Sequence, residues 1–564
     1  MSSFRSFRSF RSFRSFRSFR SFRSFRSVVL TLAALLLMPI VLVSQEYTAA
    51  PMNHNEPTDA ASAYKEHSIV QDHLVISMAF WDIDTAFERK DPILQMIEQK
   101  FNLSIQPVNI TASDYMQKLQ MWATTDKLPD VFAHSIASDS PGIYNEWITH
   151  QLIKPLPEDL TPYPYVDQIA QIPDIQLLKK DNKLYMLPRI GYPTNRLWML
   201  ERVLFVRQDW MNDLLLKDIS SFEQFSNMLT AFSNRSPKDE PRSIVGITAS
   251  GMNMLSWAFS STFPQFATEQ WVFENTRWIP FYASKKMDEV VVQLRELYAN
   301  GTLDQDFYYM KEEDAIHKFV NEEAGALVYK ATPDSLSKLE ERWNELHPDV
   351  SFYDAVDILH LWPTEDGHRY FYAAQTYWSE TFFNAKVSDE KMERILRLYD
   401  YLLSPEGQML TSYGLEGVDY YKEKDRIIIT RPYDEQKRRL VDLERTYPSI
   451  SIFRSLASWG KDRNFRFDQT NRINYGDHNI QKSLDEMEWQ LNHATATPTY
   501  HKINSLSTPA KDKLGTLINP LEDLIKVTIS NEDPVAMWHR TVERYEALGL
   551  NKAIQEVNER LQQR

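Results

Sequence analysis

The chain has 564 residues, 43% of them hydrophobic and 25% charged, which favours a globular protein with more than one compact unit over a disordered chain. It contains no cysteine and neither a GxGxxG nor a GxxxxGK[ST] motif, which excludes disulfides, thiolate metal sites, cysteine nucleophiles and a glycine-built phosphate loop. Eight arginines against one glutamate give residues 1–50 a formal charge of +7, so residues 51–564 carry −21, a balance that disfavours nucleic acid as a partner.

The first fifty residues are typical of a secretory signal. Ser3 to Arg26 repeats Ser-Phe-Arg, and Val28 to Val43 is an apolar run. A basic stretch followed by a short apolar run predicts export, and at about 1.5 Å per residue the run is shorter than a bilayer core of about 30 Å. The cleavage site is poor, so we expect either inefficient cleavage or a segment that persists as an anchor. Residues 51–67 are polar and typical of a linker.

Strand and helix patterns alternate from residue 74 onward. Leu74–Phe80 and Leu103–Val108 have the pattern of buried strands, and Asp91 followed by proline predicts a helix start between them. A helix around Tyr115–Trp122 and a short strand at Asp130–Phe132 follow. This alternation predicts a parallel sheet, in which ligands bind outside the carboxyl ends of the strands.

The same alternation returns later in the chain. Ser243–Thr248 and Gly325–Tyr329 have the pattern of strands, and Met287–Tyr298 that of an amphipathic helix ending at Asn300-Gly301. Further helices are predicted over Glu390–Gln408 and over Val535–Leu561, the latter with a break near Gly549.

Six stretches, taken in chain order, carry a resemblance to a known family. They are Leu128–Val131, Lys183–Pro188, Phe205–Trp210, Leu297–Phe307, Tyr401–Leu410 and Ser412–Tyr420. Together they resemble the family-1 extracellular solute-binding proteins of the maltose-binding-like superfamily, in the large branch that serves carbohydrate ABC importers of Gram-positive bacteria. The resemblance covers about residues 70–560, and the segment from Ser404 to Tyr420 is its most specific part.

The resemblance implies an α/β, two-lobed fold of the type II periplasmic-binding-protein kind with extra C-terminal helices. On this chain it implies lobe I over 68–198, lobe II over 199–358, a return to lobe I over 359–408, and a C-terminal helical region over 409–564 that packs mainly on lobe II. Residues 1–50 are then the basic repeat and signal or anchor segment, and 51–67 the linker.

The function implied by the resemblance is the extracellular substrate-binding component of an ABC importer. It would hold an oligosaccharide in an interlobe cleft, close by a hinge, and dock as a monomer on permease subunits. A sugar sensor for a membrane kinase, a ligand other than sugar, and a carbohydrate-active enzyme remain alternatives. We expect a secreted or signal-tethered protein but not a lipoprotein, because the lipid-bearing cysteine of many relatives is missing.

No cofactor, metal or catalysis is expected. The sequence has no HExxH or GxSxG motif, and its histidines do not cluster at metal-ligand spacing. Some relatives carry a calcium loop, but the corresponding stretch, Ser233–Pro241, lacks the glycine and alternating oxygen ligands that calcium needs.

A sugar needs flat apolar partners for its C–H faces and directed hydrogen bonds for its hydroxyls. We therefore expect ligand contacts where aromatic and polar residues meet at strand ends and at the crossings between lobes. The candidates are Trp81, Asp82, His134, Tyr192, Arg196, Asn253, Trp257, Tyr329, Tyr377, Trp378 and Glu380, each with packing as the alternative role. The acidic body disfavours a strongly anionic glycan unless Arg196, Arg207 or Lys330 reverses the field locally.

Overall fold

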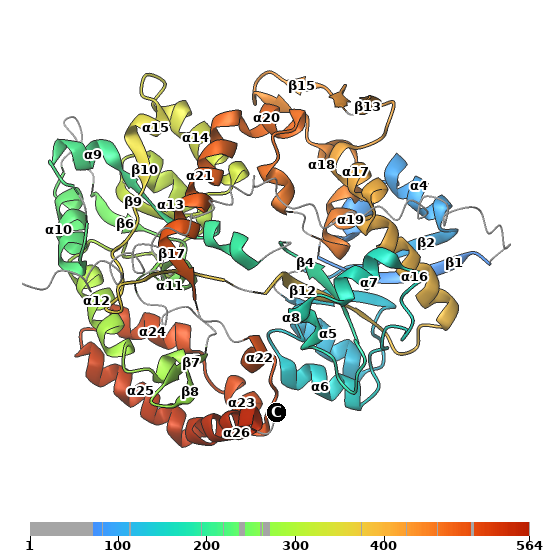
Figure 1. The fold of residues 1–564 in the computed structure, drawn as a ribbon, viewed down its shortest axis with the longest axis horizontal. Helices are drawn as coiled ribbons and strands as arrows, with labels where there is room; N and C mark the ends of the chain where they lie inside the picture. Colours follow the sequence, from blue (N-terminus) through green and yellow to red (C-terminus); the bar gives the residue numbers. More distant parts are fainter. Residues whose placement is uncertain are drawn as a thin grey trace, which may run out of the picture. The chain divides into compact units, whose positions relative to one another are not determined.

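The computed structural model describes residues 72–81, 83–111, 114–192, 195–217, 219–235, 243–259, 262, 271–373, 375–424, 426–458, 461–497 and 501–562. The chain divides into two units, Met1–Ile69 and Val70–Arg564, and all described residues belong to the second. The elements of that unit are organised around two larger sheets, one in each lobe (Figure 1). The predicted signal segment and linker lie outside the described residues.

Lobe I contains a five-stranded sheet in the order β2-β1-β3-β12-β4. Its strands are β1 (Leu74–Ala79), β2 (Leu103–Val108), β3 (Val131–His134), β4 (Leu187–Ile190) and β12 (Tyr377–Phe383). Strand β1 pairs in parallel with β2 and β3, whereas β12 runs antiparallel to both β3 and β4. The carboxyl ends of β1, β3 and β4 and the start of β12 therefore share one edge, called here the lobe I edge.

Helices cover this sheet and share its core. They are α3 (Ile83–Phe87), α4 (Pro92–Lys100), α5 (Tyr115–Thr124), α6 (Pro141–Thr149), α7 (Pro164–Ala170), α8 (Pro173–Gln176), α16 (Asp389–Leu403) and α17 (Pro405–Tyr413). The predicted start of α4 is confirmed, since the Asp91 carboxylate accepts the backbone N–H groups of Ile93 and Leu94 at 2.9 and 3.0 Å. The same carboxylate accepts two hydrogen bonds from Ser449, which ties the C-terminal part of the chain to this core.

Lobe II contains a four-stranded sheet in the order β10-β5-β9-β6. Its strands are β10 (Val356–Ile358), β5 (Val203–Arg207), β9 (Ala324–Tyr329) and β6 (Val245–Thr248). Strand β6 is parallel to β9, and β5 is antiparallel to both β9 and β10. The carboxyl ends of β6, β9 and β10 and the start of β5 therefore share a second edge, the lobe II edge.

The lobe II helices pack closely on that sheet. They are α9 (Gln208–Asp213), α10 (Phe222–Ser233), α11 (Met252–Phe259), α12 (Met287–Ala299), α13 (Glu312–Val320), α14 (Pro333–Leu346) and α15 (Phe352–Ala355). A Cβ atom on Gly325 would lie only 2.2 Å from the Phe232 ring, so β9 needs glycine where α10 crosses it. The predicted helix from Met287 ends as expected, with Asn300 as its C-cap.

Two of the segments that pass between the lobes, called here the crossings, each run from one edge to the other. Residues 191–202, with the 3-10 helix η2 (Asn195–Leu200), lead from the end of β4 to the start of β5. Residues 359–376, with β11 (Arg369–Phe371), lead from the end of β10 to the start of β12. The Trp198 indole N–H donates to the Gln375 carbonyl at 2.8 Å and joins the two crossings.

The C-terminal region contacts both lobes. Helices α18 (Leu443–Thr446) and α19 (Ser449–Ala457) contribute to the lobe I core, whereas α20 (Gln469–Tyr475) and α21 (Asp477–His493) pack on α14. Helices α24 (Pro520–Ile529) and α25 (Pro534–Leu548) pack on α12. The expectation that residues 409–564 pack mainly on lobe II therefore does not extend to residues 443–456, which bury their apolar side chains in lobe I.

The remaining elements are small hairpins and the last helices. The hairpins are β7–β8 (Trp271–Glu274 and Arg277–Pro280), β13–β14 (Tyr420–Glu423 and Arg426–Ile429) and β15–β16 (Tyr433–Asp434 and Arg439–Leu440), and β17 (Ala494–Ala496) pairs with β11. Helices α22 (His501–Asn504), α23 (Pro509–Gly515) and α26 (Leu550–Gln562) follow, and the described residues also form the 3-10 turns η4 (Phe281–Ala283) and η5 (Lys461–Phe465). The predicted break at Gly549 is confirmed: its φ of +115° ends α25 before α26 begins.

Candidate functional site

Two tryptophans form an aromatic platform at the lobe I edge. Trp81 follows β1, and Trp378 is the second residue of β12. Their indole centroids lie 5.8 Å apart with an interplanar angle of 67°. Trp378 is 47% exposed although its strand neighbours Tyr377 and Ser379 are buried, and it lies where the pairing of β12 with β4 shifts register between those two residues. One indole is therefore offered to solvent while the other, half-buried, supports it.

A buried cation lies beneath this platform. The guanidinium carbon of Arg189, on β4, is 4.7 Å from the ring centroids of both Phe80 and Trp81 and 5.8 Å from that of Trp378. The Arg189 side chain has no exposed surface, and its burial lowers its pKa to about 10, which leaves it charged at neutral pH. Cation–π contacts of this kind are worth about 0.5 to 2 kcal/mol each. Arg189 therefore holds the rings and does not itself face solvent.

Tyr115 and His134 complete the platform from the side of β3 and α5. The Tyr115 ring lies 6.0 Å from Trp81 and 5.1 Å from His134, and its hydroxyl donates to the Ala79 carbonyl at 3.0 Å. Burial lowers the pKa of His134, so its imidazole is neutral at pH 7. The platform thus places aromatic faces and a neutral imidazole beside one another.

Glu380 does not face this surface, which corrects its expected ligand contact. Its side chain is completely buried, and its carboxylate accepts the backbone N–H groups of Ile136, Ala137 and Ser138 at 2.8, 3.2 and 3.1 Å. Burial raises the pKa of Glu380 to about 8. The residue fixes the loop after β3, whose Ser135 hydroxyl in turn donates to the Trp378 carbonyl at 3.0 Å.

Three predicted tyrosines also lie in the core instead of at a ligand surface. Tyr192 is fully buried and its hydroxyl donates to the Glu201 carboxylate, while Tyr329 and Tyr377 are 2% and 4% exposed. Burial raises the pKa of both Tyr329 and Tyr377. A tyrosine at a strand end gives the same sequence pattern whether its ring faces inward or outward, so the sequence alone did not separate the two roles.

The structure brings Trp81, His134 and Trp378 together and places Asn253 elsewhere, exposed on α11 of lobe II. Asp82 lies outside the described residues, and the side chains of Arg196 and Trp257 are not described. Sequence reasoning missed Arg189 and Tyr115. A charge inside the apolar run Leu187–Ile190 was the available signal for Arg189, since arginine is rarely buried without a dedicated role.

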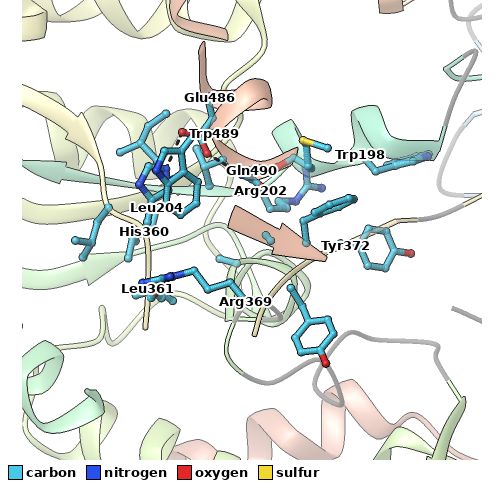
Figure 2. Close-up of a pocket in the computed structure, with 18 residues that line it drawn as sticks. Trp198, Arg202, Leu204, His360, Leu361, Arg369, Tyr372, Glu486, Trp489 and Gln490 are labelled. Atoms are coloured by element: carbon cyan, nitrogen blue, oxygen red, sulfur yellow. Dashed lines mark hydrogen bonds and ion pairs between the residues drawn. The ribbon is translucent and has the colours of Figure 1, made fainter. Parts of the chain in front are cut away.

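A pocket lined by both polar and apolar side chains lies where the two crossings meet α21. Figure 2 shows His360, Arg369 and Tyr372 of the second crossing, Trp198 and Arg202 of the first, and Glu486, Trp489 and Gln490 of α21 around it. The Glu486 carboxylate accepts from Gln490 at 2.7 Å and lies 2.8 Å from His360 Nε2, and the His360 ring stacks on Trp489 at 3.3 Å. The pocket has a volume of about 50 Å³, which is enough for a few water molecules. A small-molecule site needs roughly 300 Å³ or more.

Residues 93–415 match the profile of the family described as "Bacterial extracellular solute-binding protein", which is more than half of the chain. The chain belongs to this family. The resemblance inferred from the six sequence stretches is thereby confirmed.

The curated relatives and solved structures are distant in sequence. Lipoprotein LipO of Bacillus subtilis (strain 168) is 23% identical over 386 residues, which is 66% of this chain and 71% of the relative. The polygalacturonan/rhamnogalacturonan-binding protein YtcQ of the same organism is 21% identical over 299 residues, 51% of this chain and 57% of the relative.

Similar folds occur among solved structures. The alginate-binding protein AlgQ2 without calcium ion has a TM-score of 0.65 at 14% identity, covering 88% of this chain and 99% of that one. The S. pneumoniae ABC-transporter substrate-binding protein FusA in complex with kestose has a TM-score of 0.61 at 15% identity, covering 87% and 99%. These likenesses confirm the two-lobed α/β fold.

Two of the three cations that could reverse the acidic field locally, Arg207 and Lys330, are paired within the chain, and the side chain of Arg196 is not described. The Arg207 guanidinium, almost fully buried, binds Asp209 and Glu322, with contacts of 2.6 and 3.0 Å. The Lys330 amine lies 2.9 Å from Glu312.

Among the described residues, no group of three or more His, Asp or Glu side chains is placed to hold a metal ion, and the stretch 233–241 is described only as far as residue 235. No described helix is long and apolar enough to cross a membrane, and residues 28–43 lie outside the described part of the chain.

Proposed function

We propose that this solute-binding protein binds a neutral oligosaccharide outside the cell and delivers it, unaltered, to the permease of an ABC importer. The exposed indole of Trp378, supported by Trp81 over a buried Arg189, carries the proposal. The apolar C–H face of a sugar ring packs well on an indole. The Trp378 indole is 47% exposed, so much of its surface is available for such a contact and does not contribute to the core.

The topology supports a clamp of two lobes. Both crossings start and end at the sheet edges, so a small rotation about them changes how the two edges face each other. A ligand that contacts both edges favours the closed arrangement, because only that arrangement makes both sets of contacts. The loop bonded to Glu380 holds Trp378 ready for such a contact.

A neutral ligand suits the charges around the platform better than a uronate does. Arg189 is buried beneath the rings, Arg207 and Lys330 are paired with carboxylates, and residues 51–564 carry a formal −21. Two relatives are described by anionic glycans, polygalacturonan and alginate, whereas FusA was solved with kestose. We place this chain with the neutral class.

The remaining parts of the proposal concern partners and location. We propose a monomer that docks on separate membrane subunits, with ATP hydrolysis left to those subunits because this chain has no phosphate loop. We also propose that the protein is either secreted or tethered to the membrane by residues 28–43. The sequence contains no cysteine, so the proposal includes no lipid attached through one.

Calorimetric titration of the purified protein with neutral malto-, manno-, fructo- and galacto-oligosaccharides, and with oligouronates at moderate salt, tests this function. We expect one neutral series to bind, and Trp378→Ala to weaken its binding by about tenfold or more. Phe273→Ala, which removes another exposed aromatic ring, is the control and is expected to bind normally.

Three results would count against parts of the proposal. Binding of none of the carbohydrates would refute the sugar class, and tight binding of oligouronates alone would refute neutrality. Release of shorter sugars during incubation would show catalysis and end the claim that the ligand is delivered unaltered.

A further inference from the structure

A short segment extends the lobe II sheet beyond β6. Ile247 and Leu303 form a parallel bridge: the Ile247 N–H donates to the Thr302 carbonyl and the Asp304 N–H donates to the Ile247 carbonyl, both at 2.9 Å. Because this segment runs parallel to β6, the chain leaves it at the lobe II edge. The loop of residues 305–310 therefore begins at the edge where ligands of parallel sheets bind.

Asp304 fixes this loop to the end of β6. Its carboxylate, only 2% exposed as a residue, accepts from the Lys318 amine at 2.8 and 2.9 Å and from the Thr248 hydroxyl at 2.9 Å. Thr248 is the last residue of β6. The Asp306 N–H donates to the same carboxylate at 3.2 Å, so the loop begins from a rigid, hydrogen-bonded anchor.

Two exposed tyrosines lie on this anchored loop. Tyr308 is 39% and Tyr309 64% exposed, and their ring centroids are 4.9 Å apart at 83°. Phe307 is fully buried and contacts Tyr308 edge-on at 5.7 Å, so it connects the two tyrosines to the core of lobe II. The Tyr309 N–H donates to the Asp306 carbonyl at 3.1 Å, and the Asp306 carboxylate, which accepts the Tyr309 hydroxyl, raises the pKa of Tyr309 to about 12.

We propose that Tyr308 and Tyr309 form the aromatic subsite of lobe II, which stacks a ring of the neutral oligosaccharide. The proposal rests on the function proposed above and adds a second contact surface to the platform of lobe I. Tyrosine supplies a ring face for sugar C–H groups and a hydroxyl for hydrogen bonds. Asp306 beside the pair makes the subsite unfavourable for a uronate, in agreement with a neutral ligand.

The sequence motif Leu297–Phe307 ends one residue before this pair, so the resemblance gave these tyrosines no role. What distinguishes these two rings from other exposed rings, such as those of Phe273 and Tyr421, is their position on a loop that begins at the lobe II edge. The fixed anchor at Asp304 means that little entropy is lost when a ligand stacks on them.

The test measures affinity as a function of ligand length. The neutral series that saturates the wild-type protein is titrated, from disaccharide to hexasaccharide, into Tyr308→Ala, Tyr309→Ala and the double variant. We expect the double variant to bind the longest sugar about tenfold more weakly and the shortest nearly normally, because a short ligand cannot occupy both edges. Tyr309→Phe keeps the ring and is expected to retain most of the affinity.

Tyr421→Ala is the matched control, since Tyr421 is 46% exposed on the separate hairpin β13–β14. Thermal unfolding shows whether each variant is folded. Wild-type affinity of the double variant, with Trp378→Ala still impaired, overturns the subsite and leaves the proposed function standing. An equal loss in Tyr421→Ala also overturns it, and failure of the wild-type protein to bind any sugar ends both proposals.

Discussion

The two sheet edges hold their exposed aromatic rings in different ways. At the lobe I edge, Trp378 rests on Trp81, and both lie over the completely buried guanidinium of Arg189. At the lobe II edge, Tyr308 and Tyr309 stand on a loop that hydrogen bonds from Asp304 tie to β6. The first support is part of a hydrophobic core and the second is a local hydrogen-bonded anchor.

This difference separates stability from binding. Changes beneath the lobe I platform remove core contacts, so we expect them to lower both the free energy of unfolding and the affinity for ligand. Changes to the exposed rings of lobe II remove only surface contacts, so we expect them to lower affinity alone. In the proposed closed arrangement, the ligand would contact one surface that is part of a core and one that is held by a local anchor.

Replacing Arg189 with alanine is expected to have the largest effect. The substitution removes a fully buried side chain and its contacts with the rings of Phe80, Trp81 and Trp378, which we expect to cost about 3 kcal/mol of unfolding free energy and most of the ligand affinity. Chemical denaturation and calorimetric titration with the neutral oligosaccharides measure the two effects.

Arg189→Met separates volume from charge. Methionine fills much of the space, so we expect this variant to lose less stability than Arg189→Ala. It should still lose affinity, because the Trp81 and Trp378 rings are no longer held by the cation. A normal denaturation midpoint for Arg189→Ala would show that the platform is not coupled to the core and would remove the contrast between the edges.

The parts of the fold that sequence predicted best depend on neighbouring residues. The cap at Asp91, strand β2 and the break at Gly549 follow from local rules about carboxylates, apolar runs and glycine, and the structure confirms them. The role of Glu380 depends on backbone groups about 240 residues away in sequence, at 136–138. An acid beside a strand-end tryptophan gives the same pattern in both roles, so only the pairing of β12 with β3 distinguishes them.

The candidate site divides along the same line. Trp81 and Trp378 were predicted because both the residue type and the position at a strand end are visible in sequence. Arg189 was not, since its meaning depends on β4 lying beside β12 in the sheet. The sequence did not indicate the proposed subsite at Tyr308 and Tyr309, because residues 302–304 form too short a stretch of extended chain to show a strand pattern.

The pH dependence of stability tests the buried carboxyl of lobe I. Burial, with a smaller contribution from Asp139, raises the folded pKa of Glu380 to about 8 from an ordinary value of 4.5. Between those values the folded protein keeps a proton that the unfolded chain has released. The stabilising contribution is therefore complete below about pH 4.5 and is lost as the pH rises through about 8.

Glu380→Gln is uncharged throughout and isolates this effect. We expect wild-type protein to lose about 2 kcal/mol relative to the variant between pH 6 and pH 8, as measured by denaturant unfolding at each pH. The three backbone N–H groups favour the ionised carboxylate and oppose burial, and the folded pKa of about 8 is the net result of both. Parallel pH profiles for the two proteins would mean that Glu380 is already ionised in the fold.

The smallest expected effect concerns a contact between the C-terminal helices and lobe I. Helix α23 packs on α26, which in turn packs on the β7–β8 hairpin, and α23 also contacts α6 of lobe I (Figure 1). A Cβ atom on Gly142 of α6 would lie 3.0 Å from Cβ and Cγ of Asp512, whereas one on Gly515 of α23 would meet nothing within 4 Å. These two glycines therefore form a matched pair, one inside the contact and one outside it.

Gly515→Ala is expected to leave the free energy of unfolding unchanged or slightly higher, as is usual for glycine to alanine in a helix. Gly142→Ala is expected to have a free energy of unfolding about 1 kcal/mol lower than that of Gly515→Ala. The crowded methyl pushes α6 from α23, so the distance between spin labels on the two helices, attached through cysteines introduced into this cysteine-free chain, should lengthen or broaden only in Gly142→Ala. If ligand affinity also changes only in Gly142→Ala, this contact biases the approach of the two edges. Identical distances and affinities in both variants would leave the crossings as the elements that control closure.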